Sequence, residues 1–190
     1  MKSKIIFKIG SLISLIGFYL MMLLMIFMLM EGLSRLFIPA SGFADSFGPL
    51  EPVFAYFTID FRQQPAIYEE GQFLILYFVN ELTTGLTALL FFWFMYKLLK
   101  NIHTYSLFMY ENVSVLFKLG LSIGILGTAS TYTSNLMLSK VLSALSITNA
   151  HVSFSNLSYI DMIAGGIVLI IIALALRTAV NAVEENRKTI

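Results

Sequence analysis

Glu81 has the clearest capacity for chemistry in this sequence, because no other charged residue lies between Glu70 and Lys97. A carboxyl group inside a hydrocarbon core costs a few kcal/mol, so we expect Glu81 to face a protein interior and to be protonated or partnered. Helical spacing places polar residues around it on the same segment. We predict an intramembrane polar site that consists of Glu81, Asn80, Thr84 and Tyr77, together with Asn135 from the next helix.

Two interpretations of this polar site remain open. In the first, a protonated Glu81 donates a hydrogen bond to Asn135 or to the hydroxyl groups that precede it, and so acts as a structural strut. In the second, Glu81 is a site that takes up a proton or a cation.

Other kinds of chemistry find little support in the sequence. There is no cysteine, and neither a zinc-protease, serine-hydrolase, phosphate-loop nor dinucleotide-binding motif occurs. The two histidines, His103 and His151, fall on opposite sides of the expected membrane and cannot share a metal. We therefore expect no enzymatic activity, metal or cofactor, and a net charge of +1 gives no case for direct nucleic-acid binding.

Composition identifies the element type that positions these residues. The chain is 58% hydrophobic and 12% charged, with a mean hydropathy of +0.83, which is typical of an integral membrane protein. Four apolar segments are each long enough to cross a bilayer as a helix, once the last is extended beyond its uncharged run. We predict a single all-α integral membrane domain, a four-transmembrane-helix bundle over residues 1–190, with spanning helices at about 9–31, 73–97, 113–138 and 157–180.

The connections follow from these spans. They are an outer loop at 32–72, a cytoplasmic loop at 98–112, an outer loop at 139–156 and a cytoplasmic tail at 181–190. With both termini inside, nine Lys and Arg residues lie on the cytoplasmic side and three, Arg35, Arg62 and Lys140, lie outside. The positive-inside rule therefore places both termini in the cytoplasm.

The first outer loop holds all four prolines of the chain and many aromatic residues. Its segment "VFAYFTIDF", residues 53–61, alternates apolar and polar side chains and predicts a short strand. The second outer loop contains "SITNAHVSF", residues 146–154, which could pair with it. We therefore expect a small extracellular β element.

Small residues indicate how the helices pack. Gly120 and Gly124 form a G-x-x-x-G pair on the third segment, and Ala164, Gly165 and Gly166 give the fourth a small face. Such faces allow helices to approach closely. Packing within the chain is favoured, and a homo-oligomer formed through Gly120 and Gly124 is the alternative.

Two stretches on the cytoplasmic side resemble a known family. "KLLKNIHTYSLFMYENVSVLFKLG" has a basic helix end, a short polar turn, Phe108 and then "ENV" before Gly120, and "RTAVNAVEENRKTI" ends in paired glutamates, an asparagine and a terminal Thr-aliphatic pair. The chain resembles, end to end, the bacterial membrane-protein family called domain of unknown function 2975. Arg187 and Lys188 depart from it, since an acidic and an aliphatic residue are usual there.

The resemblance implies a multi-pass protein of the bacterial cytoplasmic membrane, whose lipid bilayer contains it, and a small helix-turn-helix DNA-binding regulator as partner. We predict a non-enzymatic accessory or regulatory protein. Its cytoplasmic partner surface would consist of Phe108, Glu111, Asn112, Glu184 and Glu185. The alternative is a small transporter or channel subunit that works through Glu81.

Overall fold

The computed structural model describes residues 2–54, 59, 61, 63–145 and 158–188. Its elements are α1 (Lys2–Phe37), α2 (Gly42–Asp45), the 3-10 helix η1 (Ala66–Glu69), α3 (Gly71–Thr104), α4 (Tyr110–Ser122), the π-helix η2 (Ile123–Gly127), α5 (Thr128–Ala144) and α6 (Ser158–Lys188). In this part of the chain, α1, α3, the continuous α4–η2–α5 segment and α6 are long and apolar enough to cross a membrane. The prediction of an all-helical fold with four helices that are long and apolar enough to span a membrane is confirmed.

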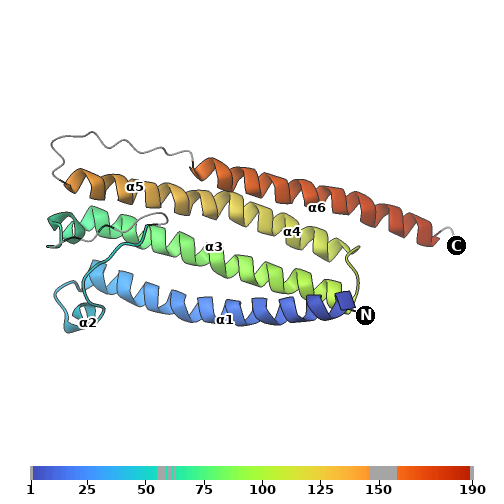
Figure 1. Ribbon diagram of the computed structural model, residues 1–190, viewed down its shortest axis with the longest axis horizontal. Helices are drawn as coiled ribbons and strands as arrows, with labels where there is room; N and C mark the ends of the chain where they lie inside the picture. Colours follow the sequence, from blue (N-terminus) through green and yellow to red (C-terminus); the bar gives the residue numbers. More distant parts are fainter. Residues whose placement is uncertain (1, 55–58, 60, 62, 146–157, 189–190) are drawn as a thin grey trace.

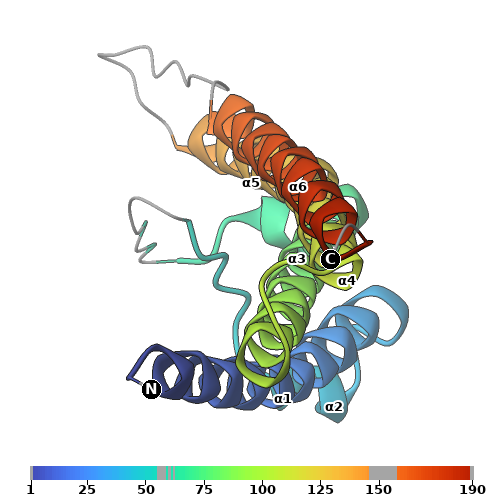
Figure 2. The same cartoon turned by 90° about the vertical axis from the view of Figure 1, so that its right-hand side faces the viewer.

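The four long helices form an open row in chain order (Figures 1 and 2). α1 packs on α3, α3 packs on the α4–η2–α5 segment, and that segment packs on α6. Among the described residues, α1 approaches no other long helix, and α6 approaches neither α1 nor α3. The two edge helices therefore leave most of their apolar surface uncovered by the chain itself, as suits contact with lipid.

Each helix is longer than the uncharged run that predicted it. α6 continues to Lys188, so most of the predicted tail at 181–190 is helical, and the predicted loop at 98–112 shortens to residues 105–109. Apolar runs measure only the part of a helix that fits the hydrocarbon core, whereas the backbone can continue beyond it with polar side chains.

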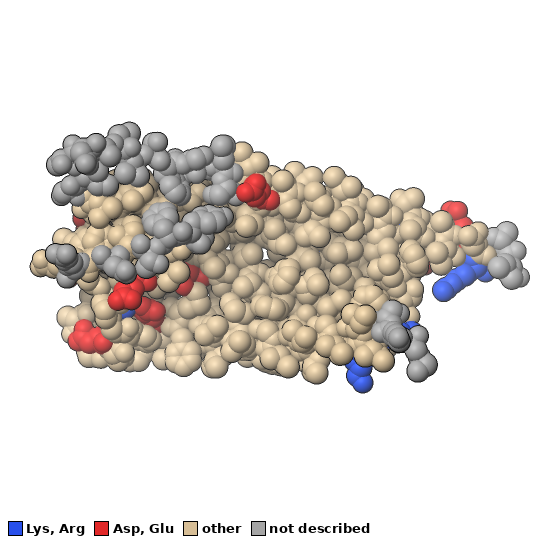
Figure 3. All heavy atoms as spheres, viewed as in Figure 1, with Lys and Arg blue, Asp and Glu red and all other residues tan. Residues whose placement is uncertain are grey.

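Both termini lie at one end of the molecule, beside the α3–α4 turn (Figure 1). We call this the terminal end, and we call the opposite end, which carries α2 and η1, the loop end. On the face shown in Figure 3, the main groups of Lys and Arg side chains lie at the terminal end, and Asp and Glu lie mostly toward the loop end. This charge asymmetry is the one from which the sequence predicted the orientation.

The contact between α1 and α3 has a period of seven residues. Phe78, Gly85, Phe92 and Leu99 of α3 face α1 in succession: Leu99 lies over Gly10, Phe92 over Gly17 and Phe78 over Gly32. Gly85 reverses the pattern, because there α1 contributes the large side chain, Met25. A seven-residue repeat of contacts is typical of left-handed, coiled-coil-like packing.

The contact between α4 and α6 is made by glycine backbones instead. A Cβ atom placed on Gly166 would lie 2.7 Å from the carbonyl oxygen of Gly120 and 2.8 Å from the Cα atom of Gly124. Gly120 and Gly124 are therefore used for packing within the chain, as the sequence favoured. In this arrangement α6 covers the surface that the alternative homo-oligomer would use.

The third membrane helix changes its hydrogen-bond pattern beside this glycine contact. Residues Ile123–Gly127 form a π-helix between α4 and α5. The hydroxyl of Thr128 donates to the carbonyl of Gly124 at 2.5 Å, and the hydroxyl of Thr131 donates to that of Gly127 at 2.9 Å. Hydroxyl groups thus bind carbonyls in and beside the π-helix turn.

A cluster of buried hydrophobic residues lies at the loop end. It joins the first loop and η1 to α3 and α5 through Leu50, Phe54, Tyr68, Phe73, Met137, Leu138 and Val141. The part of residues 53–61 that the structure describes contains no strand, so the expected β element is not supported. Residues 55–58 and 60, and the whole predicted partner segment at 146–154, lie outside the described residues.

Candidate functional site

Two hydrogen bonds connect the predicted polar site on α3 with α5. The hydroxyl of Thr133 donates to Oδ1 of Asn80 at 3.0 Å, and the hydroxyls of Thr84 and Ser130 lie 2.6 Å apart. Asn80 is only 5% exposed, so its amide is held between the two helices. Asn135 is also buried in α5. Asn80 and Thr84 therefore supply side-chain hydrogen bonds that join α3 to α5, the two elements in the middle of the row.

Glu81 lies on the other side of α3, against α1. Its neighbours are Met25, Met28, Leu29, Phe78 and Leu82, and the gap that these side chains line has no room for a water molecule. Among the described residues Glu81 makes no hydrogen bond and no ion pair. The predicted bond from Glu81 to Asn135 or to the α5 hydroxyls is therefore wrong.

The geometry of a helix explains this error. Asn80 and Thr84 are four residues apart and share a face, whereas Glu81 is rotated by about 100° from Asn80. The face that carries Asn80 packs on α5, and the seven-residue seam that includes Phe78 and Gly85 places Glu81 toward α1. Tyr77, the remaining member of the predicted site, packs against the loop-end core.

Asn112, predicted as part of a partner surface, is instead a structural residue of the α3–α4 turn. It is fully buried, and its Nδ2 donates to the carbonyls of Ser106 and Leu107, both at 2.9 Å. Its Oδ1 accepts a bond from Asn101 at 3.0 Å. Asn112 therefore closes the turn and joins α3 to α4, and it cannot contact a soluble partner.

The other predicted partner residues are exposed at the terminal end: Phe108 and Glu111 beside the turn, and Glu184 and Glu185 on α6. The hydroxyl of Tyr110 donates to Oδ1 of Asn181 at 2.6 Å and so links the start of α4 to α6. The C-terminal part of α6, which ends at Lys188, extends past the ends of the other helices (Figure 1). This exposed helical extension is the most prominent feature of the terminal end.

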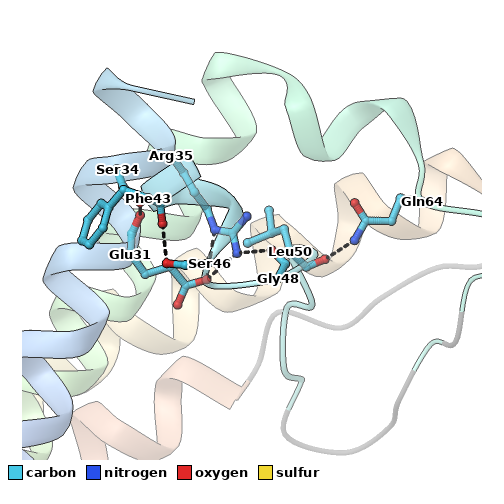
Figure 4. Close-up of polar contacts among 8 residues, drawn as sticks. All are labelled: Glu31, Ser34, Arg35, Phe43, Ser46, Gly48, Leu50 and Gln64. Atoms are coloured by element: carbon cyan, nitrogen blue, oxygen red, sulfur yellow. Dashed lines mark hydrogen bonds and ion pairs between the residues drawn. The ribbon is translucent and has the colours of Figure 1, made fainter. Parts of the chain in front are cut away.

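A further site, which the sequence analysis missed, is a cavity of about 720 Å³ at the loop end. Figure 4 shows how its walls are held: Arg35 lies between Glu31, with Nη2 to Oε1 at 2.9 Å, and the carbonyl of Gly48, also at 2.9 Å. Nε2 of Gln64 donates to the carbonyl of Leu50 at 3.1 Å. Gly48 has a φ of 76°, a conformation that favours glycine.

One signal for this cavity is present in the sequence. Glu31 and Arg35 are spaced i, i+4 at the end of the first helix, and such a pair predicts a local ion pair but not the long-range contact with Gly48.

Among the described residues, no group of three His, Asp or Glu side chains could hold a metal ion.

Comparison with known proteins adds no relative: no protein-family model, curated protein or solved structure matches this chain. The resemblance to domain of unknown function 2975 stays a prediction that rests on the motif residues quoted above.

Proposed function

We propose that this chain is a non-enzymatic protein of the bacterial cytoplasmic membrane, with both termini in the cytoplasm, that presents the α3–α4 turn and the end of α6 to a soluble regulatory partner. One observation carries the proposal: α6 continues to Lys188, beyond the terminal end of the other long helices (Figure 1). A helix that only anchors a chain in a bilayer needs no such exposed extension.

The extension carries charges of both signs, Glu184 and Glu185 before Arg187 and Lys188, and its paired carboxylates suggest the kind of partner. Glu184 and Glu185 are exposed side by side, and Glu111 is exposed beside the turn. Carboxylates complement the basic surface of a DNA-binding regulator and would compete with DNA for it. The bond between Tyr110 and Asn181 links the base of the extension to α4. A partner that displaces the extension would therefore also displace the start of α4.

Co-purification with a small helix-turn-helix regulator, the partner that the resemblance implies, tests the proposal. We expect the double variant Glu184→Lys/Glu185→Lys to bind the regulator at least about tenfold more weakly, because it reverses two charges at the contact. The matched control Glu51→Lys/Glu70→Lys, at the loop end, should bind like the unaltered protein. Equal binding by both double variants would contradict the proposal.

Reporter fusions test the orientation on which the proposal depends. Fusions after Glu70 and after Ile190 should report opposite sides of the membrane, with the second in the cytoplasm. A cytoplasmic signal from the fusion after Glu70 would place the exposed end of α6 on the wrong side for a regulator.

Transport of a proton or cation through Glu81 is a second candidate function. It is favoured by one observation, the absence of any described hydrogen-bond or ion-pair partner for this carboxyl group. The surrounding gap does not admit water, so transport would require α1 and α3 to separate. Proton flux in liposomes that Glu81→Gln abolishes, with unchanged thermal stability, would support this candidate over the first.

A further inference from the structure

The cavity at the loop end is formed by tertiary structure rather than by one loop. Its lining comes from the end of α1, from α2 and the following loop, from η1 and from the start of α3. The bonds from Arg35 to Gly48 and from Gln64 to Leu50 join these parts (Figure 4). A volume of about 720 Å³ is in the range of small-molecule binding sites.

Tyr68 provides a polar group in the cavity lining to which no described residue is hydrogen-bonded. It is only 6% exposed, and its ring stacks on Phe73 with centroids 5.1 Å apart and meets the edge of Phe61 at 5.9 Å. Its hydroxyl makes no hydrogen bond with a described residue. Among the described residues, every side-chain polar atom that is fully enclosed has a hydrogen-bond partner, so the hydroxyl of Tyr68 is not fully enclosed. The hydroxyl is therefore open to the cavity that Tyr68 lines.

The hydroxyl of Tyr68 stays protonated near neutral pH, since burial raises the pKa of Tyr68. It can accept a hydrogen bond from a ligand as well as donate one. A buried aromatic ring with an unused hydroxyl is a common part of sites that hold an amphipathic ligand.

The charges around the cavity select for a cation. The guanidinium of Arg35 is already neutralised by Glu31. Asp45 and Glu69, which also line the cavity, form no ion pair among the described residues. The remaining lining includes Pro39, Leu50 and Leu74, which offer apolar surface.

We infer that this cavity binds an ammonium group carried on an apolar body, with Asp45 and Glu69 facing the ammonium, the hydroxyl of Tyr68 accepting one of its hydrogen bonds, and Leu50 and Leu74 covering the apolar part. The same chemistry is found in a free amphipathic amine and in a phosphatidylethanolamine headgroup. This site does not depend on the proposed regulatory function, because it lies at the opposite end of the molecule.

Calorimetric titration of the purified full-length protein in a non-ionic detergent tests the site. The probe is phenethylamine, and phenethyl alcohol is its uncharged control. We expect the amine to bind at least about tenfold more tightly than the alcohol, because charge-assisted hydrogen bonds are stronger than neutral ones. Equal binding of amine and alcohol, or no binding of either the amine or phosphatidylethanolamine, overturns the inference.

Variants locate the binding. Asp45→Asn/Glu69→Gln should lower the affinity for phenethylamine by about tenfold, and Tyr68→Phe by about threefold through the loss of one hydrogen bond. The control Glu51→Gln changes an exposed carboxylate outside the lining and should leave the affinity unchanged. Asp45 and Glu69 are exposed, so their amide variants should fold, and an unchanged affinity in the double variant would overturn the assignment.

Native mass spectrometry distinguishes the two sources of the ammonium group. Protein exposed to equal amounts of phosphatidylethanolamine and phosphatidylglycerol should retain the first preferentially if a lipid fills the cavity, and Asp45→Asn/Glu69→Gln should abolish that preference. Calorimetric binding of phenethylamine without a lipid preference assigns the cavity to a free amine.

Discussion

The two glycine-containing seams of this protein use the same residue in different ways. Between α1 and α3, each glycine receives one large side chain of the facing helix, at intervals of seven residues along α3. Between α4 and α6, glycine lies on glycine and the backbones themselves are in contact. A side chain can rotate or be replaced by a smaller one, whereas a backbone cannot. The α4–α6 seam should therefore be far less tolerant of added volume.

The largest expected effect is at Gly166. Gly166→Ala adds a methyl group 2.7 Å from the carbonyl oxygen of Gly120, so the two helices would have to separate. We expect the free energy of unfolding to fall by about 3 kcal/mol, the upper range for overpacking. Reversible unfolding in mixed detergent micelles measures it.

Gly165 provides the matched control, since a Cβ atom there would meet nothing within 4 Å. Gly165→Ala should be neutral or stabilise the protein by up to about 1 kcal/mol, since alanine is the better helix former. Equal losses at Gly165 and Gly166 would show that α6 does not pack on α4 in this register.

A slightly smaller loss is expected at the turn that joins the two seams. Asn112→Ala removes one acceptor and two donor contacts from a fully buried site and leaves the carbonyls of Ser106 and Leu107 without this partner. We expect a loss of about 2 kcal/mol, measured as for Gly166. Glu111→Ala, at an exposed position, is the control. If Asn112→Ala lowers the free energy of unfolding by no more than Glu111→Ala does, the turn is held by other contacts.

A moderate effect is expected at Gly17, where the neighbour is a side chain. Gly17→Ala places a methyl group 2.6 Å from Cε1 of Phe92, and we expect a loss of about 1 kcal/mol because the ring can shift. Adding Phe92→Leu should restore part of the stability of Gly17→Ala, and a double-mutant cycle measures this coupling. Independent, additive losses would argue against the seven-residue seam.

The smallest effect is expected at Gly85, although it lies in the same seam. The nearest atom to a new Cβ is Cγ of Met25 at 3.6 Å, an ordinary contact. Gly85→Ala should therefore be neutral or stabilise the protein by up to about 1 kcal/mol, since alanine is the better helix former. Thermal unfolding alongside Gly17→Ala checks it, and a loss larger than that of Gly17→Ala would refute the ranking.

Hydropathy was sufficient to predict the four spanning helices, because the cost of exposing backbone and charge to hydrocarbon dominates in a membrane. It could not predict the open row, since lipid-facing and protein-facing surfaces are both apolar. The seven-residue spacing of Phe78, Gly85, Phe92 and Leu99 was, however, sufficient to predict the face of α3 that packs on α1. That same spacing would have placed Glu81 toward α1.

The candidate site was predictable only where local geometry decides it. Asn80 and Thr84 share one helix face, and they do meet α5. Asn112 was assigned to a surface because its motif resembled a family pattern, although an asparagine after a polar turn can equally close that turn. The loop-end cavity depends on contacts between residues more than ten positions apart, such as Arg35 with Gly48, and periodicity does not predict such contacts.

The π-helix sets the rotational phase between the two halves of the third membrane helix. A π-turn holds one more residue than an α-turn between the same hydrogen-bonded neighbours, and each residue of an α-helix corresponds to a rotation of about 100°. Gly120 before it faces α6, whereas Ser130 and Thr133 after it face α3. Deleting one residue from Ile123–Gly127 would restore an uninterrupted α-helix, and would turn either the glycine face away from α6 or the hydroxyl face away from α3. The extra residue therefore sets the rotation between the glycine face of α4 that packs on α6 and the hydroxyl face of α5 that packs on α3.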